Sequence, residues 1–404
     1  MANIDVYSGS EKIGRIQKTK SKHLYAYDLD AHHAVSLTMP VRLKSYEYES
    51  LHPFFQMNMP EGILRSAIEK ATAKQFGSDD LTVLALLGNN QIGSVRYALE
   101  GKPLRPDDGQ PLALDALLSS NDASLFSQLL ARFSMRSGVA GVQPKVLMDL
   151  ENRANSHEKV TYPLGAYIVK SWGTEYPELA CNEFICLTLA KEAGLETSPF
   201  YLSDNGKLLI TKRFDLDANA NPIGFEDFCV LQGKSTRQKY DASLESCANT
   251  INQFISVEQR QKALYDFFKL TLINVCIRNG DAHLKNYGVL YDNLQDYTLG
   301  AFPQCKIAFS PVFDIVSTVP YLPNDTMALS LTGSKRWPKW KVLYQFATQH
   351  CGLSRKKIEQ IVQEVESAKS ACLPVLQQLS EQHPEFKMIA SDIHKFLVTK
   401  IEMH

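Results

Sequence analysis

The stretch NGDAHLKN, which runs from Asn279 to Asn286, places a carboxylate, an imidazole, an ammonium group and an amide among small or apolar residues. Three interpretations fit it. Asn279, Gly280 and Asp281 could form a polar turn that ends a helix. Asp281 and His283 could bind a metal ion, although the sequence supplies no H-E-x-x-H motif and no second His/Asp cluster.

The third interpretation is a phosphoryl-transfer loop. In such a loop an aspartate accepts the proton of the substrate hydroxyl, and an asparagine five residues later holds a magnesium ion. Asp281 and Asn286 have this separation, and Lys285 between them could meet charge on the transferring phosphoryl group. A D-x-x-x-x-N pair alone occurs often by chance, so the interpretation depends on further motifs.

A kinase needs three more parts, and the sequence offers a candidate for each in the right order. Lys170 ends the apolar strand AYIVK and would meet the ATP phosphates. Upstream, SGVAGVQPK over 137–145 supplies two glycines for close approach of the backbone to phosphate. Downstream, FSPVFDIVS contains Asp314 as a second magnesium ligand, although the literal G-x-G-x-x-G and D-F-G strings are absent.

Composition and charge limit the class of protein. The 404 residues are 44% hydrophobic and 22% charged, and 43 basic against 44 acidic residues imply no polyanion partner. No apolar run approaches the roughly 18 residues of a membrane span, and the N-terminus lacks a signal sequence, so we expect a cytoplasmic protein without membrane contact. The eight scattered cysteines form no C-x-x-C motif, which indicates buried thiols.

The pattern of apolar runs predicts two domains. Residues 1–101 alternate short apolar runs with polar turns, which favours a small mixed α/β domain with a hairpin at Gly9 and a helix over 60–74. Residues 102–122 contain the Pro- and Asp-rich linker. We expect an ATP-binding lobe over 123 to about 230 and a helical lobe over the rest of the chain.

Periodicity places the main elements of the second domain. The predicted strands cover 145–148, 167–170 and 208–214. The predicted helices cover 177–194, 256–279 and most of the chain from Trp337 onward, and the second of them carries a possible capping box of Ser256 and Gln259. The stretch NGDAHLKN is therefore the loop that leaves a long buried helix.

The ordered motifs resemble those of the HipA-like serine/threonine kinases, the toxin members of bacterial toxin–antitoxin pairs. The resemblance covers essentially the whole chain. Its motifs are, in chain order, FFQMNMPEG (54–62), LLGNNQIGSVR (86–96), GVQPK (141–145), YIVK (167–170), NEF (182–184), KRFD (212–215), EDF (226–228), NGDAHLKN (279–286) and SPVFDIVS (310–317). It implies an α+β, protein-kinase-like fold, with a small mixed lobe and a helical lobe, preceded by a small mixed α/β domain.

The resemblance also implies a role for each site residue. Asp281 would be the catalytic base and Lys285 the cation that stabilises the transition state, while Asn286 and Asp314 would bind Mg²⁺. The expected ATP-binding residues are Val142, Gln143, Lys145, Lys170, Lys212, Phe214, Asp215 and His283. Within this set the backbone of Lys212 and Phe214 would contact adenine, Asp215 would lie near the ribose, and His283 would orient the loop.

Three details remain open in the sequence. Family members commonly carry an autophosphorylated serine three residues before the glycine of G-x-Q-x-K, and Gly138 stands there in this chain. Either Ser137 takes the role through an inserted residue, or the switch is weakened. Glu183 could pair with Lys170, but an exposed helical position is favoured, and Lys212 and Arg213 could be surface charges.

The leading hypothesis is an ATP- and magnesium-dependent kinase that phosphorylates serine or threonine of another protein. The resemblance implies autophosphorylation, growth inhibition through a translation factor such as an aminoacyl-tRNA synthetase, and neutralisation by a HipB-like helix-turn-helix antitoxin that carries the complex to DNA. A small-molecule phosphotransferase and a catalytically silent co-repressor are the alternatives.

Overall fold

The structure is a computed structural model that describes residues 3–59, 79–88, 91–104, 118, 160–164, 166–171 and 176–403. Several sequence predictions lie outside these residues: the helix over 60–74, most of the linker, the strand over 145–148, and the loop residues Ser137, Val142, Gln143 and Lys145.

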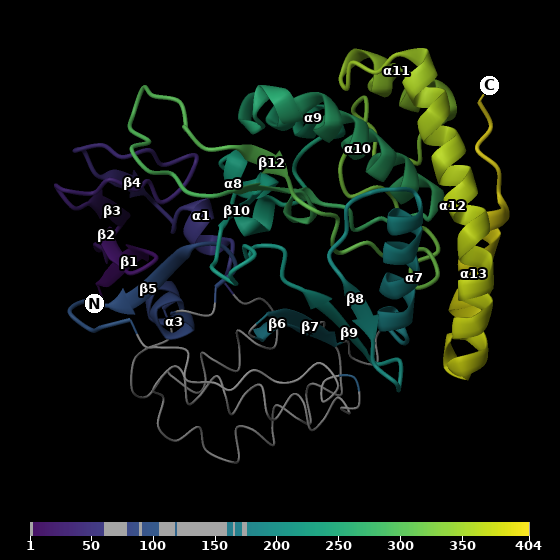
Figure 1. The fold of residues 1–404 in the computed structure, drawn as a ribbon, viewed down its shortest axis with the longest axis horizontal. Helices are drawn as coiled ribbons and strands as arrows, with labels where there is room; N and C mark the ends of the chain where they lie inside the picture. The colour runs from purple at the N-terminus through teal and green to yellow at the C-terminus, as the bar shows by residue number, and fades with distance from the viewer. Residues whose placement is uncertain are drawn as a thin grey trace.

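The N-terminal part of the chain is built on a five-stranded antiparallel sheet of order β4-β3-β2-β1-β5 (Figure 1). Its strands are β1 (Ile4–Ser8), β2 (Glu11–Lys18), β3 (His23–Tyr27), β4 (Tyr46–Tyr48) and β5 (Val95–Leu99), and its helices are α1 (Pro53–Gln56) and α3 (Asp80–Leu87). The predicted hairpin is confirmed: Gly9 turns the chain between β1 and β2 with a φ of +59°, which glycine adopts without strain.

A second, four-stranded sheet of order β6-β7-β9-β8 follows. Its elements are β6 (Val160–Leu164), β7 (Tyr167–Ser171), β8 (Phe200–Leu202) and β9 (Leu208–Lys212), with helix α7 (Leu179–Glu192) between β7 and β8. The predicted strand at 167–170 and the predicted helix are confirmed. Gly194 follows the end of α7 with a φ of +77°, in the left-handed conformation expected of a C-terminal glycine.

The rest of the chain is mostly helical and surrounds a three-stranded sheet of order β10-β11-β12. The strands are β10 (Gly224–Asp227), β11 (Gly288–Tyr291) and β12 (Ile307–Phe309). The α-helices are α8 (Phe228–Leu231), α9 (Leu244–Phe254), α10 (Val257–Cys276), α11 (Trp340–Gln349), α12 (Arg355–Gln382) and α13 (Lys387–Val398), and the 3₁₀ turns are η1 (Thr236–Gln238), η2 (Leu284–Asn286) and η3 (Pro384–Phe386).

One detail of the long helix differs from expectation. Ser256 precedes α10, as predicted, but it does not form a capping box with Gln259. Its Oγ atom instead accepts a hydrogen bond from the backbone N–H of Ile307 at 2.8 Å. The hydroxyl therefore joins the helix to strand β12, a contact distant in sequence that took the place of the local cap.

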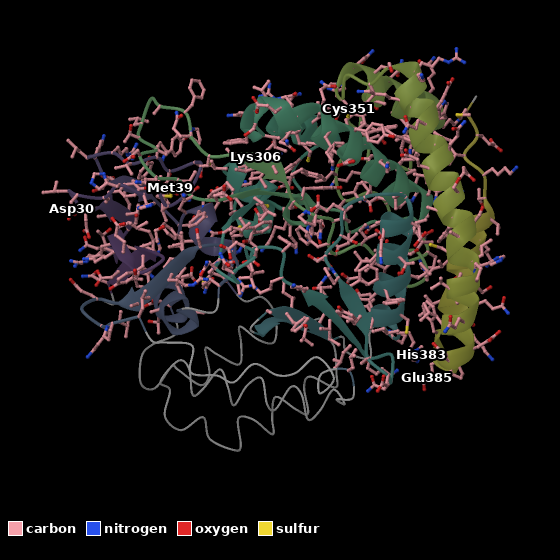
Figure 2. All side chains as sticks on the ribbon, in the orientation of Figure 1. Asp30, Met39, Lys306, Cys351, His383 and Glu385 are labelled. Carbon is pink, nitrogen blue, oxygen red and sulfur yellow. The ribbon has the colours of Figure 1, made fainter. Side chains whose placement is uncertain are left out.

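The four-stranded sheet together with α7 forms the small lobe, and the elements that follow β9 form the helical lobe. Helix α12 of the helical lobe lies alongside α7 of the small lobe (Figure 1). His383 and Glu385 lie beyond its C-terminal end, beside the loop that precedes β9 (Figure 2). There Lys207 Nζ lies 3.0 Å from Glu385 Oε2. The C-terminal helices thus brace the small lobe as well as the helical lobe.

Two large hydrophobic cores organise the described residues. One fills the helical lobe around Phe267, Phe268 and Phe346. The other begins in the N-terminal sheet and continues through Leu208 and Ile210 of β9, so the N-terminal sheet and the small lobe share one core. All eight cysteines are free thiols and six are buried. Among the described helices, none combines the length and apolar character needed to cross a membrane.

Candidate active site

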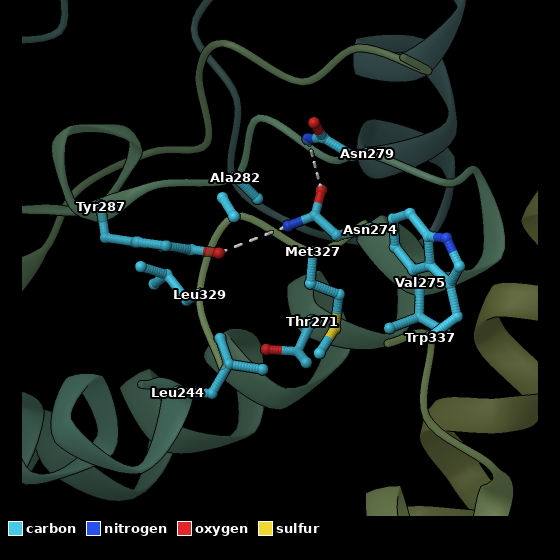
Figure 3. A pocket seen from close by; sticks show the side chains of 11 residues that line it. Leu244, Thr271, Asn274, Val275, Asn279, Ala282, Tyr287, Met327, Leu329 and Trp337 are labelled. Atoms are coloured by element: carbon cyan, nitrogen blue, oxygen red, sulfur yellow. Dashed lines mark hydrogen bonds between the residues drawn. The ribbon is translucent and has the colours of Figure 1, made fainter. Parts of the chain in front are cut away.

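The loop 279–286 leaves α10 through a sharp reversal. Arg278 adopts a φ of +57°, and the side chain of Asn279 then folds back onto the helix. Asn279 Nδ2 donates to Asn274 Oδ1 at 2.9 Å, and Asn274 Nδ2 donates to the hydroxyl of Tyr287 at 3.5 Å (Figure 3). On the other side, Asn279 Oδ1 accepts the backbone N–H of Asp281 at 3.1 Å. The asparagine pair therefore ties the start of the loop to the end of the helix.

Gly280 is required by the space around it. A Cβ atom at this position would lie 2.0 Å from Asp325 Oδ2 and 2.7 Å from the backbone oxygen of Thr326. The Gly280 N–H donates to Thr318 Oγ1 at 2.8 Å. The loop can approach the segment 318–326 this closely only because residue 280 has no side chain.

Asp281 presents its carboxylate at the surface of the site. Its side chain is 45% exposed, and Oδ1 accepts a hydrogen bond of 2.7 Å from the hydroxyl of Tyr240. The buried His283 lies behind it, with Nε2 4.0 Å from Asp281 Oδ1 and its ring edge-on to Tyr240. The His283 N–H donates to Asn286 Oδ1 at 2.8 Å, which fixes the end of the loop. The orienting role of His283 stays a prediction.

Lys285 points from the same loop toward the N-terminal part of the chain. Its Nζ atom lies 3.4 Å from the backbone oxygen of Met57, just beyond helix α1. The predicted transition-state cation therefore lies where the N-terminal part of the chain meets the loop 279–286.

Lys170 is the centre of a buried charge cluster. Its Nζ lies 2.5 Å from Glu183 Oε1 and 2.9 Å from Asp314 Oδ1, although only 6% of the residue is exposed. Asn286 Nδ2 donates to Asp314 Oδ2 at 3.0 Å, which brings the loop into the same cluster. The structure thus brings together three of the predicted site residues, Lys170, Asn286 and Asp314.

The exposed position favoured for Glu183 is wrong. Glu183 is completely buried in α7 and faces strand β7. A lysine ammonium group that leaves water needs a charged partner, because an unpaired buried charge costs several kcal/mol. Glu183 supplies this partner.

Asp314 adopts an unusual backbone conformation. Its φ of +59° is rare for a residue other than glycine, and such residues persist only where the surrounding structure holds them. On one side Phe313 packs against Phe214, with ring centroids 5.3 Å apart. On the other side the Ser317 N–H donates to Asn182 Oδ1 at 2.9 Å. These contacts hold the Asp314 backbone in a strained conformation in which its carboxylate points toward Lys170 and Asn286.

The donor set around Asp314 fits a magnesium ion. Magnesium prefers oxygen ligands and is usually held by one or two carboxylates together with substrate phosphates. Asp314 supplies a carboxylate, and the ammonium group of Lys170 beside it would meet phosphate. Asn286 turns its Nδ2 atom toward Asp314 and its Oδ1 atom toward the His283 N–H, so its amide would have to exchange these two ends to offer oxygen to the same ion. These residues therefore suit a metal–nucleotide complex.

The residues over 212–215, which are expected to contact ATP, differ from expectation in one respect. Lys212 is exposed at the end of β9, and Phe214 is half-buried. Asp215, however, is 1% exposed: Oδ1 accepts Arg213 Nε at 2.9 Å and Oδ2 accepts the Gly93 N–H at 2.7 Å. This carboxylate is engaged with Arg213 and the N-terminal part of the chain, which favours a structural role over the predicted ribose contact. The alternative of Arg213 as a surface charge is wrong, since the residue is buried.

Tyr240 and Asn274 contact the loop although no predicted motif contains them. Tyr240 lies 41 residues before Asp281, and no local pattern marks it as a partner of that carboxylate. Asn274 sits within an apolar helical stripe, where the only available signal was a polar residue at a buried position.

The two lobes, the sheet order and the cluster at their junction define a protein-kinase-like fold. Residues 137–372 match the HipA-like C-terminal domain, and residues 4–98 match the HipA N-terminal domain. The first match alone covers more than half of the chain. The chain therefore belongs to the HipA-like kinase family.

Individual relatives agree with this assignment. The chain is 28% identical over 305 residues to Y4dM of Sinorhizobium fredii, a protein named as a kinase; the alignment covers 70% of the chain and 66% of that relative, so the chain spans about two thirds of its length. It is 24% identical over 228 residues to the serine/threonine-protein kinase toxin HipA of Shewanella oneidensis, and that alignment covers 51% of each protein. These names support kinase activity at a coarse level.

Solved structures support the fold. The chain superposes on a chain of the Shewanella oneidensis complex of HipA, HipB and operator DNA with a TM-score of 0.67, at 16% identity, over 98% of this chain and 96% of that chain.

Proposed function

We propose that this protein is an ATP- and magnesium-dependent kinase that phosphorylates serine or threonine of another protein. The observation that carries the proposal is the convergence of Lys170, Glu183, Asn286 and Asp314 at one point. It joins a strand, a helix, the catalytic loop and the segment after β12. Such a cluster matches the residue types that phosphoryl transfer requires.

Each side chain has a distinct task in this proposal. Lys170 binds the ATP phosphates while Glu183 keeps its ammonium group in place. Asn286 and Asp314 hold magnesium, and Lys285 opposes the charge that develops on the phosphoryl group. ATP and magnesium, when bound, supply the phosphoryl group and the neutralisation of its charge.

Asp281 accepts the proton of the acceptor hydroxyl. Because 45% of its side chain is exposed, a hydroxyl on a folded protein can reach it. This accessibility permits a macromolecular acceptor, and the name of the Shewanella relative supports serine or threonine of a protein as the acceptor residue.

We further propose that the kinase inhibits growth by modifying a translation factor in the cytoplasm, and that a HipB-like antitoxin neutralises it. The support is the toxin name of one relative and the presence of HipB and DNA in the similar solved complex. The net charge of −1 fits a protein whose contact with DNA passes through its partner. Autophosphorylation at Ser137, which lies outside the described residues, stays a prediction.

The variant Asp281→Asn tests the kinase assignment. It removes the base while keeping the size of the side chain, and loss of a general base typically lowers a rate by about 10²–10⁴-fold. We expect normal folding and ATP binding, with phosphotransfer reduced by that factor. Mass spectrometry after incubation with ATP and magnesium measures the transfer and locates any phosphorylated residue of the chain itself.

The matched control is Asp204→Asn, the same change at an exposed aspartate outside the site. It should leave the rate unchanged. Phosphotransfer by Asp281→Asn at the wild-type rate would show that Asp281 is not the base. Magnesium-dependent ATP turnover that responds to small hydroxyl compounds, without any phosphoprotein, would favour a small-molecule phosphotransferase.

A further inference from the structure

Tyr240 lies beside the expected base, Asp281. Its hydroxyl donates to Asp281 Oδ1 at 2.7 Å, and its ring meets that of His283 edge-on at 5.2 Å between centroids. The residue is 38% exposed, so it forms part of the surface that an acceptor protein would approach.

The backbone around Tyr240 is held against the catalytic loop. The Leu284 N–H of that loop donates to the backbone oxygen of Lys239 at 3.1 Å. From another direction, Lys335 Nζ donates to the backbone oxygen of Tyr240 itself at 3.1 Å. Lys234 Nζ closes the segment by donating to the backbone oxygen of Asp241 at 2.6 Å. Tyr240 is therefore fixed in register with Asp281 through contacts that do not involve its own side chain.

We propose that Tyr240 is a positioning residue for phosphotransfer. Its hydroxyl holds Oδ1 of Asp281, which sets the rotation of the carboxylate and turns Oδ2 toward the acceptor hydroxyl. The inference rests on the proposed function, since it assigns Tyr240 to the same reaction. It also explains why a bulky, partly exposed aromatic side chain stands directly beside the base.

The chemical reason lies in the geometry of proton transfer. A general base must lie within about 2.6–3.2 Å of the proton's donor atom in a productive orientation, and a carboxylate on a surface loop can rotate away from it. A hydrogen bond to the charged carboxylate limits that rotation before the acceptor arrives. The effect falls on the rate of the chemical step rather than on ATP binding.

The variant Tyr240→Phe tests the proposal because it removes only the hydroxyl. We expect kcat for phosphotransfer to fall about tenfold, the usual effect of losing one charge-assisted hydrogen bond, with KM for ATP unchanged. Tyr265→Phe is the matched control: its hydroxyl also donates to a carboxylate, Glu364 Oε2 at 2.9 Å, but in the helical lobe. That variant should keep the wild-type kcat.

A double-mutant cycle separates positioning from a general structural effect. If Tyr240 acts through Asp281, then Tyr240→Phe should change nothing in an Asp281→Ala background. Single-turnover labelling with radioactive ATP follows the slow rates that this background leaves. An equal loss in both backgrounds would overturn the proposal, as would an unchanged kcat or a rise in kcat, which would mean that Tyr240 competes with the acceptor. If the wild-type protein itself transfers no phosphate, the proposed function fails instead.

Discussion

Lys170 shows how strongly one buried charge shapes its surroundings. The ammonium group is almost completely removed from water, and two carboxylates, those of Glu183 and Asp314, lie within 2.9 Å of it. These two carboxylates compensate the charge of the ammonium group. Removing one carboxylate would leave Lys170 with a single charged partner and would cost one hydrogen bond between charged groups.

We therefore predict that Glu183→Gln weakens both folding and catalysis. Removing the charge should lower the free energy of unfolding by about 1–3 kcal/mol, because one charge-assisted hydrogen bond is lost while Asp314 still compensates Lys170. Phosphotransfer should consequently fall at least tenfold. Chemical denaturation and the labelling assay measure the two effects. Glu192→Gln, at an exposed position on the same helix, should change neither, and equal behaviour of the two variants would contradict the prediction.

The placement of a site residue could be predicted from the sequence where the residue ends an apolar strand or follows a helix. It could not be predicted where the residue's partner is distant in sequence. Lys170 and Asp314 each follow an apolar run, so their placement followed from local pattern. Glu183 was predicted to be exposed because a helical pattern treats every charged residue as a surface residue. The same limit explains Asp215, whose contact with Gly93 spans 122 residues.

At the scale of elements, two hydrogen-bonded asparagines among apolar side chains hold the junction between α10 and the loop 279–286. Asn274 and Asn279 border a small cavity of about 20 Å³ that Leu244, Met327 and Trp337 also line (Figure 3). In such an apolar environment a hydrogen-bonded amide stabilises the fold more than it would in water, and an amide without a partner destabilises it more. The helix and its exit loop were predictable from the stripe and the Asn-Gly pair, whereas this amide pairing was not.

Asn279→Ala should therefore make the loop 279–286 more mobile while the protein stays folded. The change leaves the Asn274 amide without one partner and the Asp281 N–H without its acceptor, so we expect a loss of about 1–3 kcal/mol of stability. We also expect kcat to fall about tenfold or more as Asp281 loses its fixed position. Denaturation curves and kcat measure this, with Asn252→Ala, at an exposed position of α9, as control. An unchanged kcat would mean that the loop holds its geometry without Asn279.

For the molecule as a whole, the N-terminal part and the kinase lobes are joined by buried polar contacts. Glu226 of β10 is fully buried and accepts hydrogen bonds from Ser36 Oγ at 2.8 Å, from the Leu37 N–H at 2.7 Å and from the Tyr291 hydroxyl at 2.7 Å. Ser36 stands 190 residues earlier in the chain, a pairing that no local pattern predicts. The polar contact that joins these two parts of the chain could therefore not be predicted from the sequence.

This contact makes stability depend on pH. Burial raises the pKa of Glu226 to about 7, although the hydrogen bonds from Leu37, Tyr291 and Ser36 oppose the shift. The folded protein therefore keeps a proton on Glu226 that the unfolded chain, with an ordinary carboxyl pKa of 4.5, has released. The stability that this group contributes is complete below about pH 4.5 and is lost as the pH rises through about 7.

Glu226→Gln should abolish that dependence, because glutamine is neutral at every pH and has nearly the same shape. We expect the difference in unfolding free energy between the variant and the wild type to grow in favour of the variant from pH 5 to pH 8, with a slope of at most about 1.4 kcal/mol per pH unit. Denaturant titrations at several pH values measure it. Glu196→Gln, at an exposed position, should differ from wild type by the same small amount at every pH. If Glu226→Gln behaved likewise, Glu226 would be ionised in the folded protein throughout the range, and the contact between the N-terminal part and the kinase lobes would not respond to pH.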